Sequence, residues 1–399
     1  DLAIANGAVF DPPGKEGCAL LTGRYVSQAL RQSLREAAEI PPDGPDPVQA
    51  NLAVEADFIR FTLSGPAKEL LPAGLAMEAV LNRIEFDEAR FQAIKDQVFL
   101  ETAKVEDAPE ALARREWRRM QYEPFPYGNN PHGTTATLTA IELKDVIRFY
   151  RRCFMPNRSL LVMQSALAEP EFKRFVIRHF GSWTKREAPE YAFTQPKKRA
   201  PADPRTRCIP VTSAPESCLW FGWDCVREKD DDFEAAQLLA ELLQSRLDKL
   251  LSGRPGYRAR VHSAGLMLGG SFGISVCGPP QFDLALSRQV QELLEEIARG
   301  RFSLAEFQDI QARRLALCRQ HLAGDQLAAQ ILRAEIYRLG ARYLKLSARR
   351  IEGVIKEDLS YVVSQYLPWE KVRIVAVSPG TLGADAMPEQ LRPAVDMTP

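Results

Sequence analysis

The two halves of this 399-residue chain carry the same order of predicted secondary structure. In the first half, the alternating strand pattern of Phe58–Leu63 ends in a Gly-Pro turn at Gly65, and helical periodicity follows. In the second half, Phe272–Val276 alternates in the same way and ends in a Gly-Pro turn at Gly278 before another helical pattern. An internal repeat of this length predicts two similarly folded lobes, and it constrains the fold more than any single motif.

The ends of the two halves also match. A helix, a proline turn and a strand occur as Val146–Phe154 with Leu160–Met163, and again as Leu359–Tyr366 with Val372–Val377. Strands and helices are mixed without tight β-α-β alternation, which argues against a doubly wound nucleotide-binding fold. The sequence therefore predicts the α+β class, with two similar lobes that are each a mostly antiparallel sheet covered by helices.

A proline-rich segment separates the halves. The stretch Thr184–Ser217 holds six prolines, which prevent a continuous helix or a central strand. We therefore expect an N-terminal lobe at residues 1–188, a linker at 189–215 and a C-terminal lobe at 216–399.

Charge and hydropathy exclude some classes of partner. Lys and Arg together number 52, and so do Asp and Glu, so the formal net charge is zero. This balance gives no reason to expect nucleic acid or an anionic membrane as partner. No stretch approaches the ~20 apolar residues of a membrane-spanning helix. The chain opens at Asp1 rather than at Met, which leaves open the removal of a preceding segment.

Seven cysteines form no C-x-x-C motif. We expect most of them to be small buried side chains, which favours a reducing compartment. They are Cys18, Cys153, Cys208, Cys218, Cys225, Cys277 and Cys318.

Four stretches, in this order along the chain, resemble one known family. They are the turn Asp11–Gly17 (DPPGKEG), the acidic segment Glu106–Pro109, the loop Tyr127–Gly133 and the helix-turn-strand-helix segment Phe149–Trp183. Together they resemble the insulinase/pitrilysin-type (inverzincin) zinc peptidases, most closely the short-chain branch with the mitochondrial processing peptidases and bacterial two-subunit peptidases. The resemblance covers nearly the whole chain, although the strand that usually precedes the equivalent of Leu2–Phe10 is missing. It implies two insulinase-like lobes.

The resemblance also implies a degenerate zinc site. In active members, a helix after the first turn carries H-x-x-E-H, with two zinc ligands and a general base. The corresponding positions here are Leu20, Gly23 and Arg24, and none of these can bind zinc or accept a proton. Glu101 stands at the position of the third ligand, and one carboxylate cannot hold catalytic zinc. We expect no metal in this chain and zinc in a partner.

Arg24 and Glu101 are expected to form an ion pair in place of the zinc bridge. The family geometry brings these two positions together around the metal. A buried guanidinium without a partner is costly, so we predict that the charged groups lie within about 6 Å of each other.

Family members often use an Arg and a Tyr, seven residues apart in the second lobe, to hold the substrate. By position, Ser252 and Ala259 stand at these sites, while Arg254, Tyr257 and Arg258 lie close by but out of register. A small loop shift would make these three residues substrate-binding. The alternative is that they are exposed loop residues, and the sequence leaves both open.

These observations lead to one preferred function and one alternative. The preferred function is a catalytically silent subunit of a two-chain zinc metallopeptidase, which binds extended peptide and completes the chamber of a homologous H-x-x-E-H-bearing partner. The alternative is a non-enzymatic peptide-binding or scaffold protein on the same fold. For the compartment, the resemblance slightly favours the bacterial periplasm, whereas the cysteines lean the other way.

Overall fold

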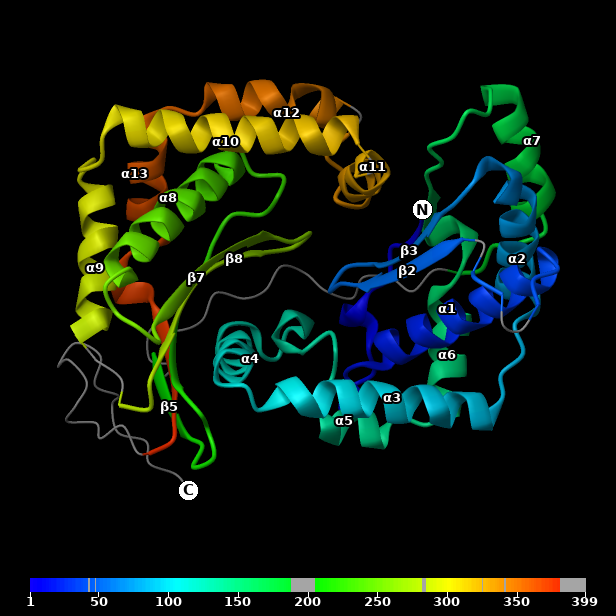
Figure 1. Cartoon of the computed structure of the whole chain (residues 1–399), viewed down its shortest axis with the longest axis horizontal. Helices are drawn as coiled ribbons and strands as arrows, with labels where there is room; N and C mark the ends of the chain where they lie inside the picture. The colour runs from blue at the N-terminus through cyan, green and yellow to red at the C-terminus, as the bar shows by residue number, and fades with distance from the viewer. Residues whose placement is uncertain are drawn as a thin grey trace. The chain divides into compact units, whose positions relative to one another are not determined.

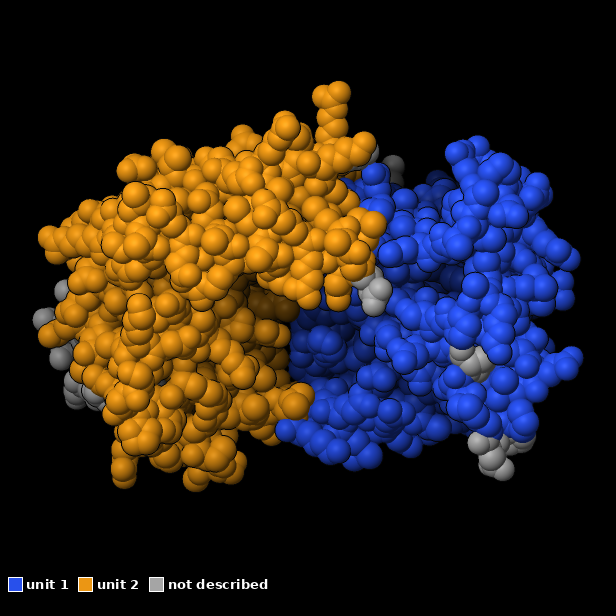
Figure 2. Space-filling view, turned by 45° about the horizontal axis from the view of Figure 1, so that its top comes forward, with its two compact units in different colours: residues 1–104, 129–192, 328–336 blue, residues 105–128, 193–327, 337–399 orange. Residues whose placement is uncertain are grey.

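A computed structural model describes residues 1–41, 44–46, 48–187, 205–281, 285–324, 326–340 and 342–380. The chain forms two compact units, which Figure 2 shows in blue and orange. Unit 1 holds residues 1–104, 129–192 and 328–336, and unit 2 holds 105–128, 193–327 and 337–399. The units differ from the predicted lobes 1–188 and 216–399 in two segments. Residues 105–128, from the first half of the chain, belong to unit 2, and residues 328–336, from the second half, belong to unit 1.

The elements of unit 1 are drawn mainly from the first half of the chain (Figure 1). They are β1 (Leu2–Ile4), α1 (Cys18–Ala37), β2 (Gln49–Val54), β3 (Ile59–Ser64), α2 (Leu70–Arg83), most of α3 (Glu88–Glu106), α5 (Thr135–Ala140), α6 (Leu143–Cys153), β4 (Ser159–Leu161), α7 (Glu169–Phe180) and all but the first residue of α11 (Leu327–Ile336). Short 3-10 turns lie at Ala8–Phe10, Ala67–Glu69 and Pro156–Arg158.

The elements of unit 2 include one helix from the first half. They are α4 (Pro109–Tyr122), β5 (Thr206–Pro210), β6 (Ser217–Asp224), α8 (Phe233–Leu251), β7 (Arg258–Gly265), β8 (Gly270–Gly278), α9 (Ala285–Ala298), α10 (Leu304–Ala323), α12 (Arg342–Gly353), α13 (Lys356–Tyr366) and β9 (Arg373–Ser378). Short 3-10 turns lie at Pro126–Gly128 and Trp369–Lys371.

The two sheets share one strand order. In unit 1 the order is β2-β3-β1-β4, and every described pairing is antiparallel. In unit 2 the order is β5-β9-β6-β8-β7, in which only β5 and β9 run parallel. The series β7-β8-β6-β9 corresponds to β2-β3-β1-β4, which supports the predicted internal repeat. The predicted α+β class with antiparallel sheets covered by helices is confirmed.

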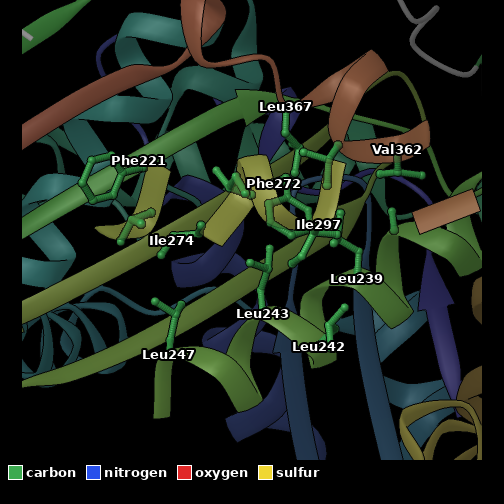
Figure 3. Close-up of a cluster of buried hydrophobic side chains, with 14 of the residues drawn as sticks. Phe221, Leu239, Leu242, Leu243, Leu247, Phe272, Ile274, Ile297, Val362 and Leu367 are labelled. Carbon is green, nitrogen blue, oxygen red and sulfur yellow. The ribbon is translucent and has the colours of Figure 1, made fainter. Parts of the chain in front are cut away.

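The core of unit 2 lies between one face of its sheet and a layer of helices. Leu239, Leu242 and Leu243 of α8 pack against Phe272 and Ile274 of β8 (Figure 3). The leucines follow helical spacing, and the strand residues alternate, so each element buries one apolar face. Residues of α9 and α13 complete the same cluster.

The opposite face of this sheet is covered by α4 (Figure 1). Trp117 of α4 is fully buried, and its ring centroid lies 6.0 Å from that of Trp220 on β6. Gly222 lies directly beneath the indole, because a Cβ atom there would stand 2.1 Å from its Nε1 and Cε2 atoms. A glycine is therefore required for α4 to approach the sheet this closely.

The proline-rich stretch 189–215 is only partly a linker. Residues 188–204 lie outside the described residues, whereas Thr206–Pro210 is strand β5, paired with β9. Proline is tolerated there because β5 ends the sheet and Pro210 is its last residue. The prolines were expected to prevent a continuous helix or a central strand, and β5 is an edge strand, so the difference is that the stretch assigned as linker includes this strand.

The expectation of mostly free, buried cysteines does not hold for one pair. Cys218 and Cys277 are directly opposite on β6 and β8 and form a disulfide. Their separation of 59 residues concealed the pairing from the sequence. Cys18 and Cys153 are buried as expected, and Cys208 is exposed. Among the described residues, no helix is both long and apolar enough to cross a membrane.

Candidate functional site

The turn Asp11–Gly17 caps α1, the helix that carries Leu20, Gly23 and Arg24. The buried Asp11 carboxylate accepts hydrogen bonds from the backbone N–H groups of Gly17, at 2.8 Å, and Ala19, at 2.7 Å. Burial raises the pKa of this carboxyl well above its ordinary range. Gly17 adopts a φ of 96°, which favours glycine. This turn therefore begins α1, whether or not a metal is bound.

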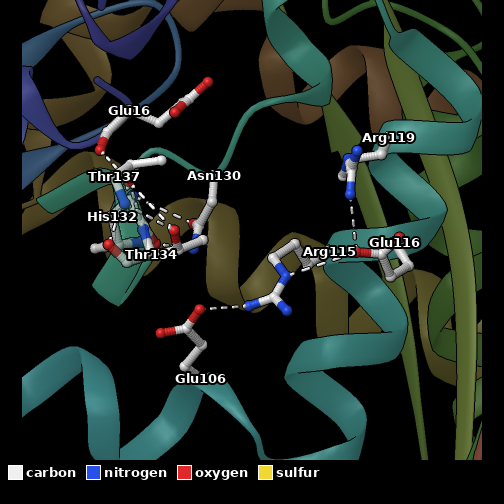
Figure 4. A network of polar contacts seen from close by, with 10 residues as sticks. Glu16, Glu106, Arg115, Glu116, Arg119, Asn130, His132, Thr134 and Thr137 are labelled. Atoms are coloured by element: carbon white, nitrogen blue, oxygen red, sulfur yellow. Dashed lines mark hydrogen bonds and ion pairs between the residues drawn. The ribbon is translucent and has the colours of Figure 1, made fainter. Parts of the chain in front are cut away.

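The loop 127–133 supports that turn from the side (Figure 4). Thr137 Oγ1, at the start of α5, donates a hydrogen bond of 2.8 Å to the Glu16 carbonyl. Asn130 Nδ2 donates to the Gly133 carbonyl at 2.6 Å and so closes the loop. Lys15 also pairs with the buried Asp145 of α6. Two of the stretches that carried the family resemblance thus form one structural unit around the start of α1.

Leu20, Gly23 and Arg24 follow one another on the first turns of α1. Leu20 is buried and apolar. A Cβ atom at Gly23 would lie 3.1 and 3.3 Å from the methyl carbons of Leu52 and 3.4 Å from Val54 Cγ2, both on β2. A glutamate at this position would therefore have to displace a β2 side chain, so a general base is sterically disfavoured as well as missing.

Arg24 and Glu101 form the predicted ion pair. Arg24 Nη2 lies 2.8 Å from Glu101 Oε2, and the other carboxylate oxygen accepts from Gln97 Nε2 at 2.9 Å. The two side chains are 42% and 46% exposed, so water and salt screen the pair. The structure thus brings α1 and α3 together at the position where the family resemblance predicts zinc, with a guanidinium in place of the metal.

The side chains at these positions do not fit zinc. Catalytic zinc needs three protein donors and an open position. Of the four residues, only Glu101 offers a donor, and both of its oxygens are already bound by Arg24 and Gln97. Within the described part of the chain, no three His, Cys, Asp or Glu side chains are placed to share a metal ion.

The substrate-binding candidates of the second half each contact another part of unit 2. Arg254 Nη2 donates to Gln289 Oε1 of α9 at 3.2 Å, and the Tyr257 ring lies against Gly278. Arg258 makes a two-pronged pair with Glu216, with one contact at 2.6 Å. At the two positions assigned by register, Ser252 is exposed after α8 and Ala259 is buried in β7.

A carboxylate of α4 organises the neighbouring strand, and sequence analysis missed it. Glu110 accepts a hydrogen bond of 2.8 Å from Ser275 Oγ and lies 3.7 Å from the nitrogens of Arg258, Arg260 and His262. The His262 contact, with the Ser275 bond and the nearby cations, lowers the pKa of Glu110 to about 2. The alternation Arg258-x-Arg260-x-His262 places two arginines and a histidine on one face of a strand, a signal that predicts an acidic partner.

The acidic segment Glu106–Pro109 joins α3 to α4, and Pro109 takes the first position of α4. Glu106 Oε1 lies 3.1 Å from Arg115 Nη1 (Figure 4). Next to Arg115, the buried Glu116 contacts Arg119 at 3.4 Å and Arg207 of β5 at 3.1 Å. These contacts give this segment a structural role in seating α4 on the sheet.

Comparisons with known proteins agree with this fold. Residues 140–314 match the family model described as Peptidase M16 inactive domain. A protease from Helicobacter pylori is 16% identical, with a TM-score of 0.84 over 95% of this chain and 92% of that one. A peptidase M16 inactive domain from Pseudomonas fluorescens is 17% identical, with a TM-score of 0.79 over the same shares. A chain of Complex III2 from Candida albicans is 10% identical, with a TM-score of 0.76 over 95% and 90%.

No curated protein matches the chain. The fold nevertheless defines a class, namely α+β proteins with the architecture of the M16 peptidases. Within that class, residues 140–314 match the inactive domain of peptidase family M16, so the resemblance to the insulinase/pitrilysin peptidases is confirmed.

Proposed function

We propose that this chain is the catalytically silent subunit of a two-chain zinc metallopeptidase and shapes the peptide-binding chamber of an H-x-x-E-H-bearing partner. One observation carries the proposal. The chain has the M16 fold, and the Arg24–Glu101 ion pair joins the two helices on which the family resemblance places the zinc ligands. The zinc of the complex would then belong to the partner.

The packing around α1 supports a fixed, inactive role. Asp11 caps the helix, and Gly23 lies against Leu52 and Val54. Restoring the H-x-x-E-H residues would therefore require the Leu52 side chain to shift, in addition to breaking the ion pair. What remains useful for a peptidase is the scaffold, in which a sheet edge other than β7 would accept an extended peptide as an added strand.

A scaffold protein without a peptidase partner is the alternative. The similarity to a chain of Complex III2 from Candida albicans favours it, because that chain belongs to an assembly. The two functions differ in one respect, which is whether a chain with H-x-x-E-H binds this one.

The first experiment measures metal and activity. The purified chain should contain no stoichiometric zinc by elemental analysis and should cleave no unstructured peptide alone. Affinity purification from the native host, followed by mass spectrometry, should recover a relative that carries H-x-x-E-H. Recovery of a stable assembly without such a relative would favour the scaffold function. If the purified chain instead holds about one chelatable zinc and cleaves peptide, the proposal is refuted.

The second experiment tests the second-half residues in the mixed complex. Replacing Arg254 and Tyr257 by Ala should lower the partner's kcat/KM about tenfold to a hundredfold, the effect of losing one charged hydrogen bond of ~1.5–3 kcal/mol. The partner's zinc content should not change. Arg288→Ala, at an exposed arginine at the start of α9, is the matched control. Unchanged cleavage by the double variant would show that Arg254 and Tyr257 have no role in substrate binding.

A further inference from the structure

Strand β7 ends the sheet of unit 2 among the described residues. In the antiparallel ladder with β8, alternate residues direct both of their backbone groups away from the partner strand. For β7 these outward residues are Ala259, Val261 and Ser263. An edge of this kind is a template for pairing with another chain unless something covers its N–H and C=O groups.

Two glutamines of α8 bind three of these outward groups, namely the Val261 N–H and the carbonyls of Ala259 and Ser263. Gln244 Oε1 accepts a hydrogen bond of 2.8 Å from the Val261 N–H, and Gln244 Nε2 donates to the Ala259 carbonyl at 3.1 Å. Gln237 Nε2 donates to Ser263 Oγ at 3.0 Å and approaches the Ser263 carbonyl at 3.4 Å. The two glutamines are seven residues apart, which is two helical turns, so they project from the same side of α8.

The bonds made by Gln244 imitate those of a neighbouring strand. In a parallel ladder, one residue donates its N–H to a carbonyl and accepts from the N–H two residues further along. A single carboxamide on Gln244 makes this pair of bonds, one on each side of Arg260. Its second N–H bonds Asp248 Oδ1 at 2.8 Å, which fixes the orientation of the amide.

The corresponding edge strand of unit 1, β2, has a different kind of hydrogen-bond partner. On β2, Arg31 Nη2 of α1 donates to the Ala50 carbonyl at 2.7 Å. A guanidinium has no acceptor, so Arg31 can serve carbonyl groups but no N–H group of that edge. A carboxamide has both a donor and an acceptor, so Gln244 binds both an N–H and a C=O group of β7. It therefore replaces a neighbouring strand more completely than Arg31 does at β2.

We propose that Gln237 and Gln244 close strand β7 to strand addition by a second copy of this chain. Without them, the outward groups of β7 would match those of β7 in another copy, since two identical antiparallel edges pair about a two-fold axis. This role is independent of the proposed peptidase complex.

The experiment compares the full chain with Gln237→Leu/Gln244→Leu, in which the side chains keep similar size but lose all hydrogen bonding. Gln291→Leu is the matched control, because Gln291 only bonds Glu295 along its own helix, α9. Sedimentation velocity over a range of concentrations should show self-association of the double variant at least about tenfold tighter than that of the wild type and of the control. Equal association of all three proteins would overturn the proposal.

Two further measurements locate the effect. Adding Val261→Pro to the double variant removes the outward N–H at an edge position that tolerates proline, and should abolish the gained association. Association that survives this change would not involve β7 and would overturn the proposal. In dilute, folded Gln244→Leu, the Val261 amide should exchange its hydrogen about three- to tenfold faster than in the wild type, as for the loss of one hydrogen bond. Equal exchange would mean that Gln244 does not protect the edge.

Discussion

Gly222→Ala tests whether α4 is seated on the second sheet through direct contact. An added Cβ would lie 2.1 Å from Nε1 and Cε2 of Trp117 and 2.7 Å from Cδ1, well inside van der Waals contact. Trp117 is 2% exposed and has no room to retreat without moving the helix. Overpacking of this kind costs about 1–3 kcal/mol, so we expect the free energy of unfolding to fall by at least that amount.

Urea denaturation followed by circular dichroism measures this change. Gly253→Ala is the control, since its Cβ would meet nothing within 4 Å, and it should stay within about 0.5 kcal/mol of the wild type. In a Trp117→Leu background, Gly222→Ala should cost much less, and the difference gives a coupling energy of about 1–3 kcal/mol. If Gly222→Ala is as stable as Gly253→Ala, then α4 does not pack on β6 as described.

Three further predictions concern single contacts. In a double-mutant cycle of Arg24→Ala and Glu101→Ala, the coupling energy should be about 0–1 kcal/mol because the pair is half exposed, and a value above about 2 kcal/mol would contradict this account. Glu110→Gln should lower the free energy of unfolding by about 1 kcal/mol at pH 7. The pKa of Glu110 is about 2 in the folded protein against an ordinary 4.5, so the stability difference between wild type and Glu110→Gln should be full above pH 4.5 and vanish as the pH falls toward 2. Urea titrations at pH 7 and pH 3 measure it. A stability difference that is the same at both pH values would exclude the Glu110 carboxylate as its source. Cys218→Ser/Cys277→Ser should cost about 2–5 kcal/mol, whereas an unchanged denaturation midpoint in the presence and absence of reductant would show that the disulfide does not form.

Local patterns predicted the elements of this fold well. Alternation and helical periodicity do not depend on distant partners, so the repeated strand-turn-helix order could be found in both halves. The contact between Arg24 and Glu101 was also predicted, although only through the family resemblance, since periodicity cannot show that α1 and α3 meet. The capping box at Ser303 and Glu306 is another local feature, and it lies where the spacing predicts it.

Features that depend on tertiary pairing were missed. Glu110 meets Ser275 from 165 residues away, and Cys218 meets Cys277 across two strands whose register no local pattern specifies. Strand β5 was read as linker because proline density outweighs a short apolar pattern, and only the position of β5 at the sheet edge makes it tolerable. The glutamines of α8 look like ordinary surface residues until β7 is placed beside them.

The assignment of residues 105–128 to unit 2 and 328–336 to unit 1 has a consequence for synthesis on the ribosome. Helix α4 leaves the ribosome long before the strands that bury Trp117, and the first sheet lacks α11 until nearly the whole chain has emerged. We therefore expect unit 1 to become complete only after most of unit 2 has been synthesised, rather than as a finished domain early in translation. A fragment that ends at the proline-rich stretch would carry α4 with its tryptophan exposed, which makes such fragments prone to aggregation.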